Sequence, residues 1–290
     1  MSSRPTLFRT AVAGIPFAWL LIFFLLPFVI VFAISLVPAT DGQPPFASPL
    51  APANLTLDNY RLLAGDELYA AAFGNALRIA ATSTLIALVV GYPMAYAIAR
   101  SPQTWRGPLL LLVVLPFWTS FLIRIYAWMI LLRPTGLINT ALQATGLIDE
   151  PLPLIANQFA VHLGIVYSYL PFMVLPLYAA LERLDSSLLE AAFDLGCRPA
   201  VAFWRVTVPL SLPGIVAGCL LVFIPAVGEF VIPDLLGGPD TPMIGRVLWT
   251  EFFANRDWPT ASAVAVLLLV ALVGPIVIFQ ALERRAAGEP

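Results

Sequence analysis

Glu190-Ala191-Ala192-Phe193-Asp194-Leu195-Gly196, followed after nine intervening residues by Val206-Thr207-Val208-Pro209, is the stretch that decides the fold of this chain. It lies in a charged segment, 182–211, between two strongly apolar runs. A simple connection between two membrane helices needs no ordered structure, yet this segment carries the start and stop signals of two short helices. We therefore expect a pair of helices on the membrane surface, shaped to be held by something soluble.

The helix signals follow one another along this segment. Ser187-Leu188-Leu189-Glu190 has the spacing of a capping box, in which each polar side chain bonds the backbone amide of the other residue. Gly196 stands where a helix end favours a left-handed residue, and Pro199 suits the first turn of a second helix. That helix should stop near Pro209. Taken alone, these signals fit equally well a helix-turn-helix that only joins two spans.

The composition places the chain in a membrane. Sixty per cent of the 290 residues are hydrophobic and 11% are charged, whereas a soluble domain carries about 25% charged residues. The net charge of −2 gives no sign of nucleic-acid binding. Cys197 and Cys219 are too few for a disulfide framework and have no metal-ligand companions. We expect one transmembrane domain over 1–290, with no cofactor and no metal.

Six apolar runs are long enough for helices that cross a bilayer, which takes roughly 20 residues. They lie near 17–37, 76–99, 108–132, 159–181, 212–236 and 261–282. Arginines precede the first run, as in a secretory signal, but the run is longer than a signal core and five more follow it. We expect an uncleaved first helix in an all-α, multi-pass protein.

Arginine placement predicts the orientation, because cytoplasmic loops carry an excess of basic residues. With the N-terminus inside, nine arginines fall in inside segments and four in outside loops. The nine are Arg4, Arg9, Arg100, Arg106, Arg183, Arg198, Arg205, Arg284 and Arg285, and the four are Arg61, Arg133, Arg246 and Arg256. Both termini are therefore expected in the cytoplasm.

The deciding stretch resembles the coupling motif of importer-type ABC permeases. That motif reads Glu-Ala-Ala, three residues, Gly, nine residues, then aliphatic-x-aliphatic-Pro. It is carried here by Glu190, Ala191, Ala192, Gly196, Val206, Val208 and Pro209, with Val-x-Val-Pro where the family usually has Ile-x-Leu-Pro.

The resemblance extends over essentially the whole chain. Gly91–Tyr96, Phe117–Ser120 and Arg124–Trp128 are similar to family patterns in the second and third spans. The run Gly228–Gly238 resembles the polyamine branch and, together with Trp249–Trp258, its putrescine-type permeases.

The resemblance implies a type I importer permease of the MetI-like fold, with six transmembrane helices, in the bacterial inner membrane. It implies four kinds of partner: a second homologous permease, two cytoplasmic ATPase subunits that receive the loop helix, a periplasmic polyamine-binding protein, and membrane lipid. This chain has no phosphate-binding loop of the GxxxxGK[ST] kind. It should therefore be no enzyme, with ATP hydrolysis on the partner subunits.

Charged residues inside the predicted spans allow two interpretations. Arg124 and Glu229 each lie roughly 25 Å from the cytoplasmic edge at 1.5 Å per residue, so an ion pair between the third and fifth spans could fix their packing. Alternatively, Glu229 and Asp234 present negative charge to a cationic cargo, and the rings of Trp118 and Tyr126 add cation–π attraction. The sequence leaves both interpretations open.

Other functions fit the sequence less well. The same architecture could carry another small solute, such as an amino acid, sulfate or iron. An ion-driven secondary carrier is disfavoured because the six spans show no internal repeat. An intramembrane hydrolase would need a nucleophile–base pair or a metal-ligand cluster in the spans, and the sequence shows neither.

Overall fold

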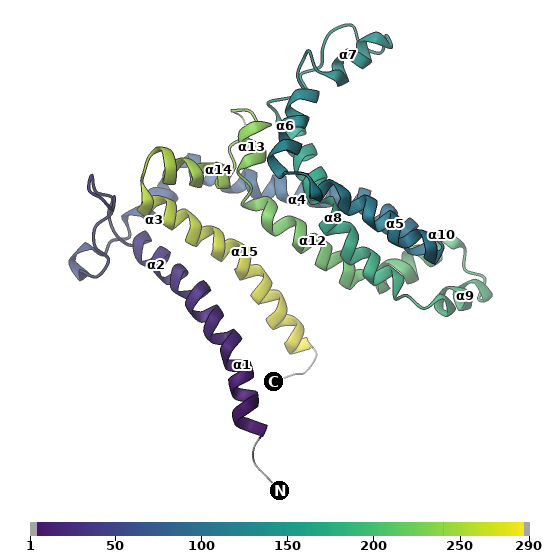
Figure 1. Cartoon of the computed structure of the whole chain (residues 1–290), viewed down its shortest axis with the longest axis horizontal. Coiled ribbons are helices and arrows are strands. Elements are labelled where there is room, and N and C mark those ends of the chain that lie inside the picture. The colour runs from purple at the N-terminus through teal and green to yellow at the C-terminus, as the bar shows by residue number, and fades with distance from the viewer. Residues whose placement is uncertain (1–4, 240, 287–290) are drawn as a thin grey trace. The chain divides into compact units, whose positions relative to one another are not determined.

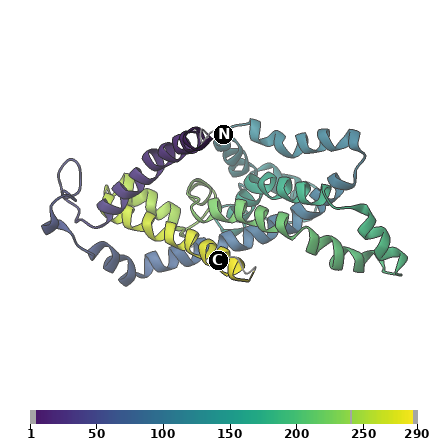
Figure 2. The same cartoon turned by 90° about the horizontal axis from the view of Figure 1, so that it is seen from below.

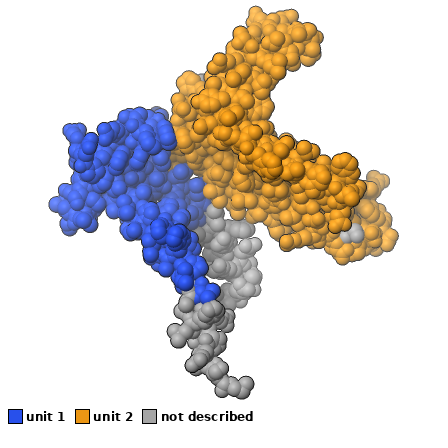
Figure 3. Space-filling model, viewed as in Figure 1, with its two compact units in different colours: residues 1–70, 247–290 blue, residues 71–246 orange. Residues whose placement is uncertain are grey.

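The computed structural model describes residues 5–239 and 241–286, and within them every regular element is a helix, apart from one isolated bridge between Ala39 and Phe46. The chain forms two compact units, residues 1–70 with 247–290 and residues 71–246 (Figure 3). The two ends of the chain, 1–4 and 287–290, lie outside the described residues, and the cytoplasmic position of the termini stays a prediction.

The first unit contains the first and last helices of the described chain. α1 (Pro5–Leu20), a π-helical turn (Leu21–Leu25) and α2 (Leu26–Ser35) follow one another, and α2 packs along α15 (Trp258–Ala286) (Figure 1). The stretch Gly14–Ser35 is long and apolar enough to cross a membrane, and its most apolar 18-residue window has no buried residue. Hydrocarbon suits such a surface better than water does, so we expect lipid around it.

A buried asparagine side chain links α3 to the end of α2. α3 (Asp58–Gly65) begins after the loop that follows α2. The Asn59 side chain lies buried there, and its Nδ2 donates to the carbonyl oxygens of Ser35 and Val37, each at 2.9 Å. These bonds satisfy carbonyls at the end of α2 that have no partner within the helix.

The second unit holds the long helices and the breaks between them. Its helices are α4 (Glu67–Arg100, entering from the first unit), α5 (Gln103–Val114), α6 (Phe121–Leu131), α7 (Leu137–Ala144), α8 (Gln158–Glu182), α9 (Ser186–Asp194), α10 (Pro199–Ala202), α11 (Val208–Leu210), α12 (Leu212–Val227), α13 (Val231–Leu235) and α14 (Ile244–Trp249). α4 and α8 are each long and apolar enough to cross a membrane.

Small residues let the helices of this unit pack closely. α12 lies along α8 (Figures 1 and 2). A Cβ added at Gly218 would fall 2.8 Å from Met173 Sδ and 3.1 Å from Met173 O, and one added at Gly91 of α4 would fall 2.9 Å from Met173 Cγ. Met173 is fully buried at the centre of the core. Such close approach of backbones is how helices associate in lipid.

Two of the predicted spans are not continuous helices. Over 108–132, α5 passes into a 3₁₀ turn (Leu115–Trp118), Thr119 and Ser120 are extended, and α6 leaves at 87°. Over 212–236, α12 ends at Val227 and a break separates it from α13. Pro116, which lacks an N–H, lies in the first break, and the Glu229 carboxylate stabilises the second, as described below.

The number of membrane crossings stays a prediction. Three helices of the described chain are long and apolar enough to span, or up to five if the bent pairs α5–α6 and α10/α11–α12 each count as one. The second bend is 64°. The apolar part of α15 within the described side chains, Trp258–Val273, is shorter, and the rest of the predicted span 261–282 is described only as helix.

Candidate functional site

Two features of the second unit are candidates for function, and the first is the helix pair around Glu190. α9 begins one residue before the predicted capping box, and its N-cap is Asp185, whose Oδ1 accepts a hydrogen bond from Ser187 N at 2.9 Å. Hydrogen bonds from the Ser187 backbone and side chain lower the pKa of the Asp185 carboxyl. The predicted Ser187–Glu190 capping box was wrong, because Asp185 already supplies the acceptor that the free amides need.

The turn after α9 has the geometry that the glycine predicts. Gly196 adopts φ = +77°. Its N–H donates to Phe193 O at 2.8 Å, and Cys197 N donates to Ala192 O at 2.9 Å. This pair of bonds is the Schellman arrangement, which satisfies the last carbonyls of a helix and favours glycine. The prediction of a sharp glycine turn at this position is confirmed.

The second surface helix is anchored to a membrane helix. Pro199 is its first residue, as predicted, and it continues through a π-helical turn (Phe203–Thr207) and α11 to Leu210. Phe203 meets the rings of Tyr92 and Tyr96 of α4 edge-on at 5.6 and 5.7 Å. The second surface helix is therefore in direct contact with α4.

The face of α9 is free to meet a partner. Figure 1 shows α9 beyond the ends of α8 and α12. Glu190 and Ala191 are exposed, Ala192 is half-buried and Leu195 is 87% exposed. Val206 is half-buried and Pro209 is exposed on the second helix. A short, capped helix with exposed apolar residues is suited to being held by another protein.

The second candidate is a pocket of about 460 Å³ where the two helix breaks meet α8. It is lined by Phe117, Phe121, Arg124, Ser168, Tyr169, Phe172, Pro225, Gly228, Glu229, Phe230 and Val231. Broken helices at membrane depth are tolerated where their backbone is buried in protein or lines a cavity. Both breaks fit that description.

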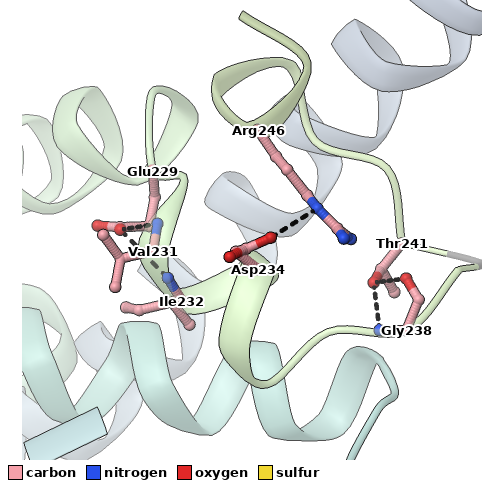
Figure 4. Close-up of polar contacts among 7 residues, drawn as sticks. All are labelled: Glu229, Val231, Ile232, Asp234, Gly238, Thr241 and Arg246. Carbon is pink, nitrogen blue, oxygen red and sulfur yellow. Dashed lines mark hydrogen bonds and ion pairs between the residues drawn. The ribbon is translucent and has the colours of Figure 1, made fainter. Parts of the chain in front are cut away.

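Glu229 holds the break after α12 in place. The residue is only 8% exposed, and three donors converge on its carboxylate. Oε1 accepts from Val231 N at 3.0 Å and Ile232 N at 3.4 Å (Figure 4), and Oε2 accepts from the Tyr169 hydroxyl. The carboxylate therefore caps α13, whose first amides have no helical partner. Sequence reasoning missed Tyr169, since no local pattern relates it to Glu229.

Arg124 is buried in the same pocket but does not pair with Glu229. No ion pair joins the two in the part of the chain that the structure describes, and Arg124 Nε and Nη1 are buried without a hydrogen-bond partner. The guanidinium carbon lies 4.8 Å from the centre of the Phe117 ring and 5.8 Å from that of Phe121. Of the two interpretations that the sequence leaves open, the direct ion pair is therefore not formed among the described residues, where Glu229 accepts hydrogen bonds from Tyr169 and the α13 amides instead.

Asp234 and the two predicted pathway rings lie away from this pocket. Asp234 Oδ1 pairs with Arg246 Nε at 3.1 Å, and both side chains are partly exposed (Figure 4). Trp118 is 75% exposed and Tyr126 is 46% exposed, and neither lines the pocket. The rings that do line it are those of Phe117, Phe121, Tyr169, Phe172 and Phe230. Contact of Asp234, Trp118 or Tyr126 with cargo stays a prediction.

The segment after α13 packs against the break that holds Glu229. A turn is closed by Thr241, whose Oγ1 accepts from Gly238 N at 2.9 Å and donates to Gly238 O at 2.8 Å (Figure 4). Farther along, a Cβ added at Gly245 would collide with the carbonyl oxygens of Gly228 and Glu229. The glycine is needed for α14 to approach the break so closely.

Comparisons with known proteins show what this chain is similar to. A family model described as "Binding-protein-dependent transport system inner membrane component" matches residues 91–288. The chain is 43% identical to the spermidine/putrescine transport system permease protein PotB of Haemophilus influenzae, over 91% of this chain and 90% of that one. It is 35% identical to the inner membrane ABC transporter permease protein YdcU of Escherichia coli, over 75% and 74% of the two chains.

A solved structure shows the same fold. A chain of a bacterial alginate ABC transporter, crystallised with an alginate pentasaccharide-bound periplasmic protein, matches with a TM-score of 0.73 and 18% identity. The match covers 97% of this chain and 96% of that one. At this identity, the likeness concerns the fold alone.

The all-α fold with its exposed surface helix is therefore that of an ABC transporter permease. The chain belongs to the family of binding-protein-dependent transport system inner membrane components. The fold class, the inner-membrane location and the resemblance read from the sequence are confirmed. Membership implies three kinds of partner: a binding protein, ATPase subunits and a second permease.

Proposed function

We propose that this chain is the permease subunit of a polyamine importer, with putrescine as the first candidate cargo and spermidine as the second. The relatives named as spermidine/putrescine permeases support the cargo. ATP would be hydrolysed on two cytoplasmic ATPase subunits, and a periplasmic polyamine-binding protein would deliver the cargo. A second homologous permease would complete the pathway.

One observation carries the proposal: a buried carboxylate stands in an aromatic pocket at a helix break. Acidic side chains are rare at membrane depth and mark cation pathways, and aromatic rings attract ammonium groups through their faces. Glu229 supplies the acid, and Tyr169 and Phe172 supply rings next to it.

In this mechanism α9 is the mechanical link. The ATPase subunits would grip α9 through Glu190, Ala191 and Leu195, and the second surface helix would pass the movement to α4 through Phe203. The turn at Gly196 fixes the angle between the two surface helices.

The experiment is putrescine uptake into proteoliposomes that contain the full complex, with ATP inside and the binding protein outside. Glu229→Gln keeps the shape of the side chain and removes its charge, and it should lower uptake at least tenfold. Asp58→Asn is the matched control, because Asp58 is an exposed acid on α3 whose contact is Arg61 at 2.9 Å. Unchanged uptake in Glu229→Gln would remove this residue from the pathway, and no polyamine uptake by the wild type would refute the cargo.

A further inference from the structure

Arg124 is a buried cation with no role in the transport mechanism proposed above. It stands on α6, just after the 87° break, and only 8% of it is exposed. Nε and Nη1 reach no acceptor, and Ser168 Oγ, which lines the same pocket, is also buried without a partner. Burying a charge without a counter-ion is unfavourable, so its retention needs a reason.

The guanidinium lies over two aromatic rings of the pocket that could otherwise bind a cargo ammonium. Its charge lies over the rings of Phe117 and Phe121 at 4.8 and 5.8 Å, and cation–π attraction is the interaction these rings would otherwise offer to an amine. Arg124 and Glu229 line the same cavity of about 460 Å³. Because no acid neutralises Arg124 among the described residues, its field acts on anything held there.

We propose that Arg124 is a built-in counter-charge that weakens the hold of this pocket on amines, and more so for each additional ammonium group. This proposal rests on the proposed function. A transport site must bind its cargo well enough to admit it and weakly enough to release it. An aromatic pocket that contains the Glu229 carboxylate would release a dication slowly, and the guanidinium of Arg124, which has no ion pair among the described residues, opposes that binding.

The size of the effect follows from Coulomb's law. At a separation of about 10 Å and an effective dielectric constant of about 20, repulsion by one unit charge lowers affinity on the order of tenfold. A second ammonium lies farther along the cargo and adds a smaller factor. The loss of affinity should therefore increase from a monoamine to a diamine to a triamine.

The test measures binding of 1-aminobutane, putrescine and spermidine to the purified complex without its binding protein, and maximal uptake with it. Arg124→Gln and Arg124→Met both remove the charge, and methionine can still stack on the rings. In both variants affinity for 1-aminobutane should rise on the order of tenfold, with a larger rise for putrescine and the largest for spermidine. Maximal uptake should fall, because release slows. Arg124→Lys, which keeps the charge, should stay within a few-fold of the wild type.

Three results would overturn the proposal. Equal changes in affinity for all three amines would mean that charge is not what Arg124 contributes. A similar loss of uptake in the lysine and both neutral variants would indicate a structural role, or an acid from another subunit that pairs with Arg124. If the wild type imports no amine, the proposed function fails as well. If the wild type imports amines but the neutral variants change affinity equally for all three, only the role of Arg124 fails.

Discussion

Replacement of Gly196 by alanine should uncouple transport from ATP hydrolysis. Gly196 has φ = +77°, and nothing lies within 4 Å of where its Cβ would be. The substitution therefore introduces no collision, and its whole effect is the strain of a left-handed residue, about 1–2 kcal/mol. That amount disfavours the observed turn between the surface helices by a factor of roughly 5–30.

The chain offers a matched control for this experiment. Gly146 has φ = +70° and is equally free of neighbours, but it follows α7 rather than α9. Gly146→Ala should therefore carry the same backbone strain without touching the coupling segment. The two variants separate a loss of stability from a loss of coupling.

The assay is the ratio of cargo imported to ATP hydrolysed, measured in proteoliposomes for the wild type and both variants. Gly196→Ala should lower this ratio several-fold while the complex still assembles, and Gly146→Ala should leave it unchanged. A wild-type ratio in Gly196→Ala, or an equal fall in both variants, would refute the view that this turn transmits force.

Three further predictions concern individual contacts. Tyr169→Phe removes one donor from the buried Glu229 carboxylate, and thermal unfolding should show destabilisation by about 1–3 kcal/mol; an unchanged Tm would mean that the bond contributes nothing. Gly245→Ala should displace the break at Gly228 and reduce uptake at least several-fold. Uptake equal to that of the wild type would show that α14 can move away from the break without loss of function. The pKa of the Asp185 carboxyl is lowered in the folded state, so the ionised cap should stabilise α9 above the ordinary carboxyl pKa of 3.8 and lose that contribution as pH falls through the folded value. Hydrogen exchange of the first α9 amides, corrected for the intrinsic effect of pH, should accelerate over that acidic range, and no acceleration would contradict this.

The surface helices could be predicted from sequence because their signals are local. Gly196 and Pro199 each act within one turn of their own position, and both stand where the sequence placed them. The capping box failed for a local reason too, since Asp185 accepts the hydrogen bond from the Ser187 amide that Glu190 was predicted to accept.

The pocket could be predicted only in part, because its contacts join distant segments. The sequence identified Glu229 and Arg124 as charged residues inside the predicted spans. It could not show that Tyr169, 60 positions earlier, reaches Glu229. Nor could it show that Glu229 would accept hydrogen bonds from the α13 amides, which leaves Arg124 in the same pocket without an ion pair.

The most direct test of the central claim is photo-cross-linking from α9 in the working complex. A photoreactive residue in place of Ala191, which is exposed on α9, should form an adduct with an ATPase subunit, and the yield should change when ATP binds. The same residue in place of Leu50, which is 91% exposed in the first unit, should give no such adduct. Continued import with no adduct from position 191 would contradict the account.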